Sequence, residues 1–172
     1  MKEKKCKVCG KGFAPFRSTQ RVCSVECSVV DAKAKSWQKE KKVRKENMIT
    51  ASQWRKMLQS SVNAYVRARD EGRLCISCNR QLKGKYDAGH YYSVGSYPNL
   101  RYDEMNIWGQ CVHCNQHLHG NLIEYRTNLL QRIGEDGLAR LDSLKNEPLK
   151  LTVPEIKDLI EVYKKKIREL KK

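Results

Sequence analysis

Long apolar runs are absent from this sequence. No hydrophobic stretch approaches the roughly 20 residues that a membrane-spanning helix requires, so we expect no membrane span. The opening residues MKEKKCKVCG carry no apolar segment behind their lysines, and we therefore expect no secretory leader. In a reducing cytoplasm, which is the expected compartment, cysteine thiolates bind metal ions instead of pairing as disulfides.

Acidic residues are scarce. The chain has 19 Asp and Glu against 35 Lys and Arg, which gives a formal net charge of +16 and a pI near 9.6. Such an excess raises the local concentration of polyanions and is typical of proteins that bind nucleic acid or an anionic membrane surface. A basic protein that is merely soluble is the alternative.

Glycine and proline are nearly absent between residues 31 and 73, where Gly72 is the exception. Strong helix formers fill this region, and its first half is charged on nearly every side, so we expect a solvated linker helix or a DNA-contacting arm. A second helix is predicted to begin near Thr50, where Thr50 and Gln53 offer a capping box. Its apolar stripe is expected to pack against a neighbouring module, with stacking on bases as the alternative; the stripe consists of Trp54, Met57, Leu58, Val62, Tyr65 and Val66.

The eight cysteines all lie in close pairs, separated by two or three residues. This spacing predicts two four-thiolate zinc sites instead of a disulfide framework or a redox motif. The first site consists of Cys6, Cys9, Cys23 and Cys27, and the second of Cys75, Cys78, Cys111 and Cys114. The first reads as a zinc ribbon that either docks DNA through Lys11, Arg17 and Arg21 or caps the fold.

The C-terminal part reads as helical. An amphipathic face from Leu122 to Ile133 ends at Gly134, and leucines at 138, 141 and 144 suggest a short second helix. Thr152 and Glu155 then supply a capping box for a last helix, and these helices are expected to form a packing or dimer surface.

The expected fold class is therefore α+β and mostly helical. Its four predicted parts are a zinc ribbon (1–30), a basic helical linker with a packing helix (31–73), a zinc-stapled core (74–125) and a helical tail (126–172). At 172 residues the chain is long enough for a few small modules, and the cysteine spacing favours that arrangement over one large core.

The central segment, residues 75–121, combines the second cysteine tetrad with His90, Asn106, Asn115 and His119. Glycines and a proline punctuate short aromatic stretches that suit a hairpin, and the residues after Cys111 are expected to be helical. Asn115 and His119 are four residues apart, so on a helix they would project from one face towards a shared metal. A tetrahedral all-thiolate site leaves zinc no open position, so these extra polar side chains point to a second, open metal site.

The spacing of these residues resembles the HNH, or ββα-metal, endonuclease motif in its zinc-stapled form. Fifteen residues separate His90 from Asn106, eight separate Asn106 from Asn115, and three separate Asn115 from His119. The segments DAGHYYSVGSYPNLRYDEMN and QCVHCNQHLHGN more specifically resemble the NinG (Rap) recombination-endonuclease family of lambdoid phages, over the whole chain.

This resemblance implies a role for each site residue. His90 would be the general base that takes a proton from the attacking water, and Asn106 would orient it through a hydrogen bond. Asn115 would bind one catalytic Mg²⁺ or Mn²⁺ ion, with His119 or His117 beside it. The residue before the base is usually an acidic or histidine ligand, whereas here it is Gly89; Asp87 is the nearest replacement, with Asp103 and Glu104 as alternatives.

The implied substrate is branched DNA, such as Holliday junctions and D-loops, in the cytoplasm of a host cell. Four cations near the core, Arg80, Lys83, Lys85 and Arg101, would contact phosphates together with Arg17 and Arg21 of the ribbon. Tyr91, Tyr92 and Tyr97 would pack the hairpin or stack on bases. Paired cuts in a symmetric junction suggest a homodimer, and recombination proteins are further expected partners. The alternative is a non-catalytic zinc-ribbon DNA-binding or adaptor protein.

Overall fold

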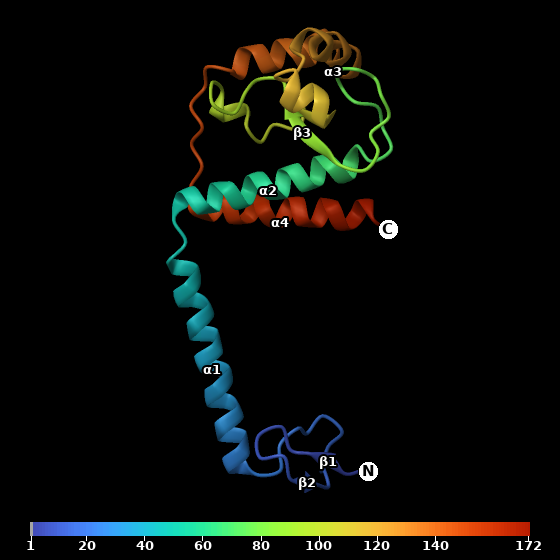
Figure 1. Ribbon diagram of the computed structural model, residues 1–172. Coiled ribbons are helices and arrows are strands. Elements are labelled where there is room, and N and C mark those ends of the chain that lie inside the picture. The colour runs from blue at the N-terminus through green and yellow to red at the C-terminus, as the bar shows by residue number, and fades with distance from the viewer. Residues whose placement is uncertain (1) are drawn as a thin grey trace. The chain divides into compact units, whose positions relative to one another are not determined.

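The computed structural model describes residues 2–172, and they separate into two compact units (Figure 1). The first unit ends at Thr50 and the second is Ala51–Lys172. The fold is α+β and mostly helical, as predicted. Within the described part of the chain, no helix is both long and apolar enough to span a membrane.

The first unit combines a small hairpin with one long helix. Strands β1 (Lys4–Lys5) and β2 (Gly12–Phe13) pair antiparallel, and α1 (Val25–Asn47) follows. Ser24 caps α1 by accepting a hydrogen bond from the Cys27 amide. No residue of α1 is buried, which confirms the predicted solvated helix.

The second unit contains a pair of helices, α2 (Ala51–Arg69) and α4 (Val153–Leu170), that lie side by side (Figure 1). Helix α2 begins directly after Thr50, as predicted, and buries Trp54, Leu58, Val62 and Val66. Met57 of the predicted stripe is 43% exposed. The pairing of the helices therefore supports the packing interpretation for most of the stripe.

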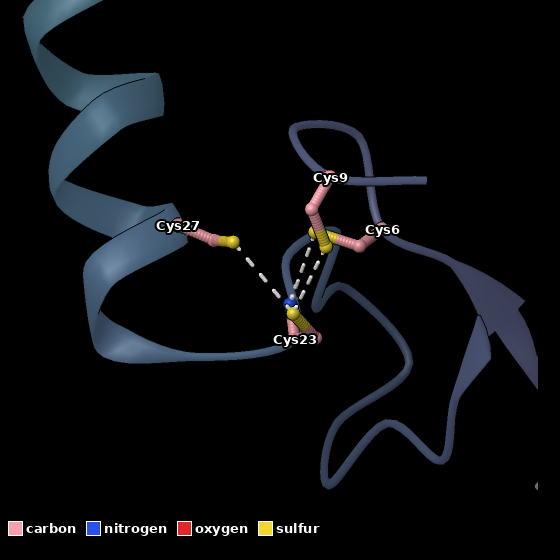
Figure 2. A group of neighbouring side chains, drawn as sticks. All are labelled: Cys6, Cys9, Cys23 and Cys27. Carbon is pink, nitrogen blue, oxygen red and sulfur yellow. Dashed lines mark hydrogen bonds between the residues drawn. The ribbon is translucent and has the colours of Figure 1, made fainter. Parts of the chain in front are cut away.

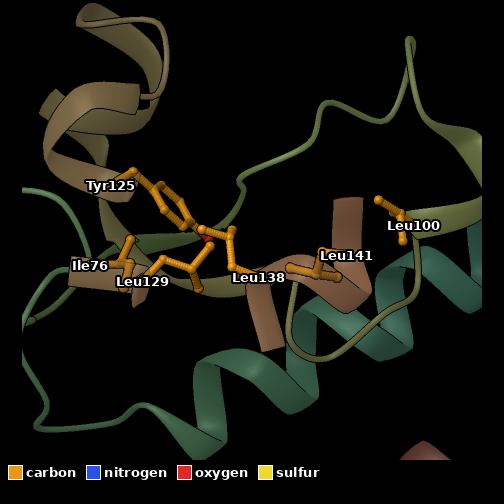
Figure 3. Packing of buried hydrophobic residues seen from close by; sticks show 6 residues of the cluster. All are labelled: Ile76, Leu100, Tyr125, Leu129, Leu138 and Leu141. Carbon is orange, nitrogen blue, oxygen red and sulfur yellow. The ribbon is translucent and has the colours of Figure 1, made fainter. Parts of the chain in front are cut away.

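A two-stranded antiparallel sheet, β3 (Tyr86–His90) and β4 (Ile107–Cys111), lies between this helix pair and α3 (Leu122–Leu144). Its register pairs Tyr86 with Cys111 and His90 with Ile107, so His90 and Cys111 stand at opposite ends of the ladder. Figure 3 shows the buried hydrophobic cluster of this unit, formed by Ile76, Leu100, Tyr125, Leu129, Leu138 and Leu141.

A buried ion pair holds the sheet against the end of α2. Asp70 is fully buried, and its Oδ2 accepts hydrogen bonds from the Gly109 amide at 2.7 Å and from Arg69 Nη2 at 2.8 Å. Arg69 also donates to the carbonyl of Ile107. An added Cβ at Gly109 would lie 2.6 Å from Leu82 Cδ1 and 3.0 Å from Asp70 Cβ, so a larger residue there would require these buried side chains to shift.

Helix breaks follow the sequence closely in the C-terminal part. Gly134 interrupts α3 with φ 71° and ψ 177°, which gives the two predicted helices on either side of it. Thr152 caps α4, and the reciprocal bond from the Thr152 amide to Glu155 completes the predicted capping box. Two of the predicted module boundaries, after residues 30 and 125, fall inside α1 and α3.

The segment after Cys111 differs from the prediction. The expected helix is only a five-residue π-helical turn, His113–His117. His119 lies beyond it with φ 49°, followed by Gly120 at φ 92° and Asn121 at φ 43°. Three consecutive left-handed residues cannot continue a right-handed helix, so Asn115 and His119 do not share a helical face.

Candidate functional site

The four cysteines of the first tetrad come from the turn between β1 and β2 and from the start of α1. Cys6 follows β1, Cys9 stands in the turn, and Cys23 and Cys27 flank the start of α1 (Figure 2). All four Sγ atoms lie within 4.8 Å of one another. The Cys9 and Cys23 sulfurs are 3.5 Å apart, and those of Cys23 and Cys27 are 3.7 Å apart.

The second tetrad joins two distant parts of the second unit. Cys75 and Cys78 stand in a turn closed by the Leu74–Gln81 bridge, Cys111 ends β4, and Cys114 lies in the π-helical turn. These four sulfurs also lie within 4.8 Å of one another. The Cys111 amide donates to Cys75 Sγ and the Cys114 amide to Cys111 Sγ, as expected for thiolate acceptors.

Both tetrads fit tetrahedral zinc. With Zn–S bonds of about 2.3 Å, the edge of the tetrahedron is about 3.8 Å, close to the observed sulfur separations. Backbone hydrogen bonding, chiefly at Cys9, lowers the pKa of Cys6 to about 6. Hydrogen bonding with the Cys9 and Cys6 sulfurs raises the pKa of Cys23 to about 12. Four crowded thiolates repel one another, and a shared dication removes that repulsion.

A separate pocket of about 250 Å³ lies beside the sheet and brings three of the predicted site residues together. Its lining consists of His90, Tyr91, Ser93, Val94, Asn115, His119, Gly120 and Leu122. His117, the alternative to His119, does not line it. Among residues 2–172, the clusters of three or more His, Cys, Asp or Glu side chains able to hold a metal are the two cysteine tetrads.

His90 ends β3, and a backbone carbonyl orients its ring. Its Nε2 lies 3.1 Å from the carbonyl oxygen of Arg101, which can only accept, so Nε2 carries the proton. Burial lowers the pKa of His90 below 6.5 and outweighs the hydrogen bonds to the Arg101 and Ala88 backbones, which favour the charged ring. In the tautomer with the proton on Nε2, the neutral ring has its lone pair on Nδ1.

Asn106 does not bond to His90, and the predicted orienting hydrogen bond is wrong. Its buried Oδ1 accepts from the Tyr92 amide at 2.7 Å, while Nδ2 donates to the carbonyls of Tyr92 and Leu100 at 3.0 Å. The amide is fully used in closing the loop between the strands. Asn106 thus fixes the backbone on both sides of the loop that carries His90, and the Arg101 carbonyl orients the ring.

Asp87 is hydrogen-bonded to Asn115, which lines the pocket. Its Oδ2 accepts from Asn115 Nδ2 at 2.9 Å and from Gln116 Nε2 at 2.8 Å. This bond turns the Asn115 amide so that its Oδ1 is directed away from the carboxylate. Asp87 itself is not among the lining residues of the pocket.

The predicted phosphate-contacting cations differ in their surroundings. Arg80, Lys83, Lys85, Arg17 and Arg21 are exposed. Arg101 is half-buried, and its Nε donates to Gln59 Oε1 at 2.7 Å. Arg101 therefore also contributes to packing against α2.

The sequence analysis did not predict a role at the site for Tyr125, whose hydroxyl binds the backbone next to His90. It is fully buried and donates to the carbonyl of Gly89 at 3.0 Å, next to His90. Burial raises the pKa of Tyr125 well above 10, so the hydroxyl keeps its proton. An apolar helical stripe contained this residue, but periodicity alone does not show which backbone carbonyl its hydroxyl reaches.

Comparison with known proteins gives consistent matches along the full chain. Protein ninG of Escherichia phage 933W is 35% identical over 189 residues, covering 98% of this chain and 94% of that protein. Protein ninG of Escherichia phage lambda is 34% identical over 184 residues, covering 95% and 90%, and protein ninG of Salmonella phage P22 is 34% identical over 186. No solved structure matches. The family model described as "Bacteriophage Lambda NinG protein" matches residues 1–172, and the chain belongs to this family.

Proposed function

We propose that this protein is a metal-dependent DNA endonuclease with an HNH-like core. The observation that carries the proposal is that one pocket is lined by His90 at the end of β3 and by Asn115 and His119 of the turn after β4. An imidazole with a free lone pair beside an amide oxygen and a second imidazole suits hydrolysis of a phosphodiester. A structural zinc site alone does not account for this arrangement.

His90 would act as the general base. Its Nε2–H donates to the Arg101 carbonyl, which leaves Nδ1 to accept the proton of the attacking water. Because burial lowers its pKa, the ring is neutral at pH 7 and able to accept. Tyr125 and Asn106 hold the backbone on either side and keep the ring in this position.

Asn115 Oδ1 and His119 would hold the catalytic Mg²⁺ or Mn²⁺ ion. This ion, when bound, supplies positive charge against the phosphate and the leaving 3′ oxygen. We assign Asp87 to orienting Asn115, since its carboxylate accepts from the Asn115 amide. Two protein ligands agree with the preference of Mg²⁺ for keeping waters and substrate phosphate.

Branched recombination intermediates are the proposed substrates, in line with the resemblance to the NinG (Rap) endonucleases. The first 50 residues carry 14 Lys and Arg against 5 Asp and Glu, so the ribbon and α1 can attract DNA without reading its sequence. Two copies of the chain would make the paired cuts in a symmetric junction.

The test is cleavage of a synthetic four-way junction with Mg²⁺. Wild type is expected to cut it, while His90→Ala should bind with similar affinity and cut at least 100-fold more slowly, as for loss of a general base. His117→Ala is the matched control, because His117 is exposed and lies outside the pocket, and it should cut normally.

Two results would contradict the proposal of a nuclease with His90 as its general base. Equal cleavage by His90→Ala and wild type would assign the activity to a contaminant or another base. Junction binding by wild type without cleavage in either Mg²⁺ or Mn²⁺ would favour the non-catalytic DNA-binding alternative.

A further inference from the structure

A second, larger pocket adjoins the candidate active site. It measures about 490 Å³ and is lined mainly by Tyr91, Tyr92, Tyr97, Leu122, Ile123 and Arg126. Tyr91, Ser93 and Leu122 line both this aromatic pocket and the pocket that contains His90. The two pockets are therefore immediate neighbours.

Three tyrosine rings form one wall of the aromatic pocket. The Tyr91 and Tyr92 ring centroids are 4.7 Å apart and those of Tyr92 and Tyr97 are 4.8 Å apart, both edge-to-face. Tyr91 also packs against the buried ring of Tyr125. The wall is therefore a rigid extension of the core that still presents aromatic surface to the pocket.

The opposite side is apolar and carries one positive charge. Ile123 is 82% exposed and Leu122 is 49% exposed, although both lie in the first turn of α3 beside the core. Arg126 Nη1 donates to the Tyr91 hydroxyl at 2.9 Å, which places the guanidinium at the edge of the aromatic wall. Exposed apolar side chains next to a fixed cation match a ligand that is flat, apolar on its faces and attached to a negative group.

We infer that the aromatic pocket holds an unstacked nucleobase of the strand whose phosphate lies at His90. This inference rests on the proposed function and specifies its substrate: DNA with an unpaired base beside the cut. The base stacks on the tyrosine wall while Arg126 contacts the adjoining phosphate. Bases at a branch point unstack at lower cost than bases within a duplex, so the pocket favours branched over linear DNA.

The test places the fluorescent base 2-aminopurine at the branch point of a four-way junction, or within one arm as a reference. It uses the full chain carrying His90→Ala, so that emission is read without cleavage. Emission should change on binding only for the branch-point probe, because that base alone exchanges its neighbouring bases, which quench it, for the tyrosine wall. Ile123→Ser/Arg126→Gln in this background should abolish the emission change and weaken junction binding by about 5- to 160-fold, the range expected for one stacked base.

The matched control is Leu170→Ser/Arg168→Gln on α4, which removes the same charge and a similar exposed apolar side chain outside the pocket. It should keep both the emission change and nearly all the affinity. Tyr97→Phe should also keep the emission change, whereas Tyr97→Leu should lose it, since leucine fills space but offers no ring.

If the Ile123→Ser/Arg126→Gln variant gives the same emission change on binding as its His90→Ala parent, the inference is overturned. A second result would also overturn it: the variant loses self-association, measured by sedimentation, while its emission response stays equal to that of the parent. The pocket would then hold a second copy of the chain. Cleavage of the same junction by the otherwise wild-type chain is a separate readout. Normal cutting with no branch-point signal would refute the base pocket alone, and a branch-point signal without any cutting would refute the nuclease proposal.

Discussion

Two asparagines of the proposed site have the same side chain and opposite surroundings. Asn106 is fully buried, and both of its polar atoms bind backbone groups of the loop. Asn115 is half-buried, donates to Asp87 and lines the pocket. At the residue scale, burial therefore separates a structural role from a proposed ligand role.

Asn106→Ala should lower the free energy of unfolding of the second unit by about 3 kcal/mol. It removes three hydrogen bonds and leaves the Tyr92 and Leu100 backbone groups buried without partners. Urea denaturation followed by circular dichroism measures the loss. Asn115→Ala is the control: it should change stability by less than about 1 kcal/mol and still abolish junction cleavage. Equal destabilisation by the two substitutions would contradict this assignment.

The pH dependence of cleavage should report the burial of His90. Since burial depresses its pKa below 6.5, the base remains unprotonated at lower pH than an exposed histidine, and the rate should rise with pH around a midpoint below 6.5. The free energy of unfolding should depend on pH in the same direction. Below pH 6.5 the unfolded chain protonates His90 more readily than the folded chain does, so stability is highest above pH 6.5 and falls as the pH is lowered. Single-turnover rates between pH 5 and 8 check it, and a midpoint above 6.5 would rule out His90 as a desolvated base.

The spacing in the sequence singled out His90, Asn115 and His119, and the structure places all three in the lining of one pocket. The sequence assigned the wrong partner to His90, since the Arg101 carbonyl belongs to the backbone and any residue type supplies the same oxygen. The role of Asp87 as a metal ligand was likewise predicted from proximity in sequence, whereas its neighbours are the Asn115 and Gln116 amides.

At the scale of elements, the β3–β4 sheet explains why glycine precedes His90. A Cβ at Gly89 would lie 2.1 Å from Gln110 Oε1 and 3.0 Å from Gln110 Cβ. Gln110 is itself buried, and its Nε2 donates to Ser77 and to the Gly120 carbonyl. The side chain of Gln110 thus occupies the space where the resemblance leads one to expect a metal-binding residue.

Gly89→Ala should therefore destabilise the second unit by about 1–3 kcal/mol, the usual cost of overpacking. Gly95→Ala is the control, because no heavy atom lies within 4 Å of an added Cβ there, and it should change stability by less than about 0.5 kcal/mol. Thermal unfolding of the two variants compares them. A Gly89→Ala protein as stable as wild type would mean that Gln110 moves freely.

The helices marked by apolar periodicity, a glycine break or a capping box were predicted well, whereas the irregular turn after Cys111 was not. The stripe from Trp54 to Val66, the break at Gly134 and the Thr152–Glu155 box each reflect local rules that tertiary contacts do not override. The segment from His113 to Asn121 is shaped by Cys111 and Cys114 converging on one tetrad and by its left-handed residues. Such constraints come from partners distant in sequence, so helical periodicity gave a longer helix than the structure contains.

At the scale of the whole molecule, each unit has its own cysteine tetrad. Cys6→Ser/Cys9→Ser should reduce the zinc content from two ions per chain to one and leave the thermal transition of the second unit unchanged, because thiolate-bound zinc stabilises only the unit that contains it. Metal analysis and calorimetry of the full chain measure this. Cys75→Ser/Cys78→Ser should abolish the thermal transition of the second unit. If the full chain instead shows a single transition that both double variants abolish, the two units do not unfold independently.

The pairing of α2 with α4 also has a consequence during synthesis. These helices are separated by the 83 residues from Asp70 to Thr152, which take roughly 4–17 s to translate. Throughout that interval the nascent chain exposes the apolar side chains of α2 that are buried in the folded unit, namely Trp54, Leu58, Val62 and Val66. The nascent chain is therefore most exposed to chaperones and proteases before α4 emerges, and slower elongation would lengthen that vulnerable period.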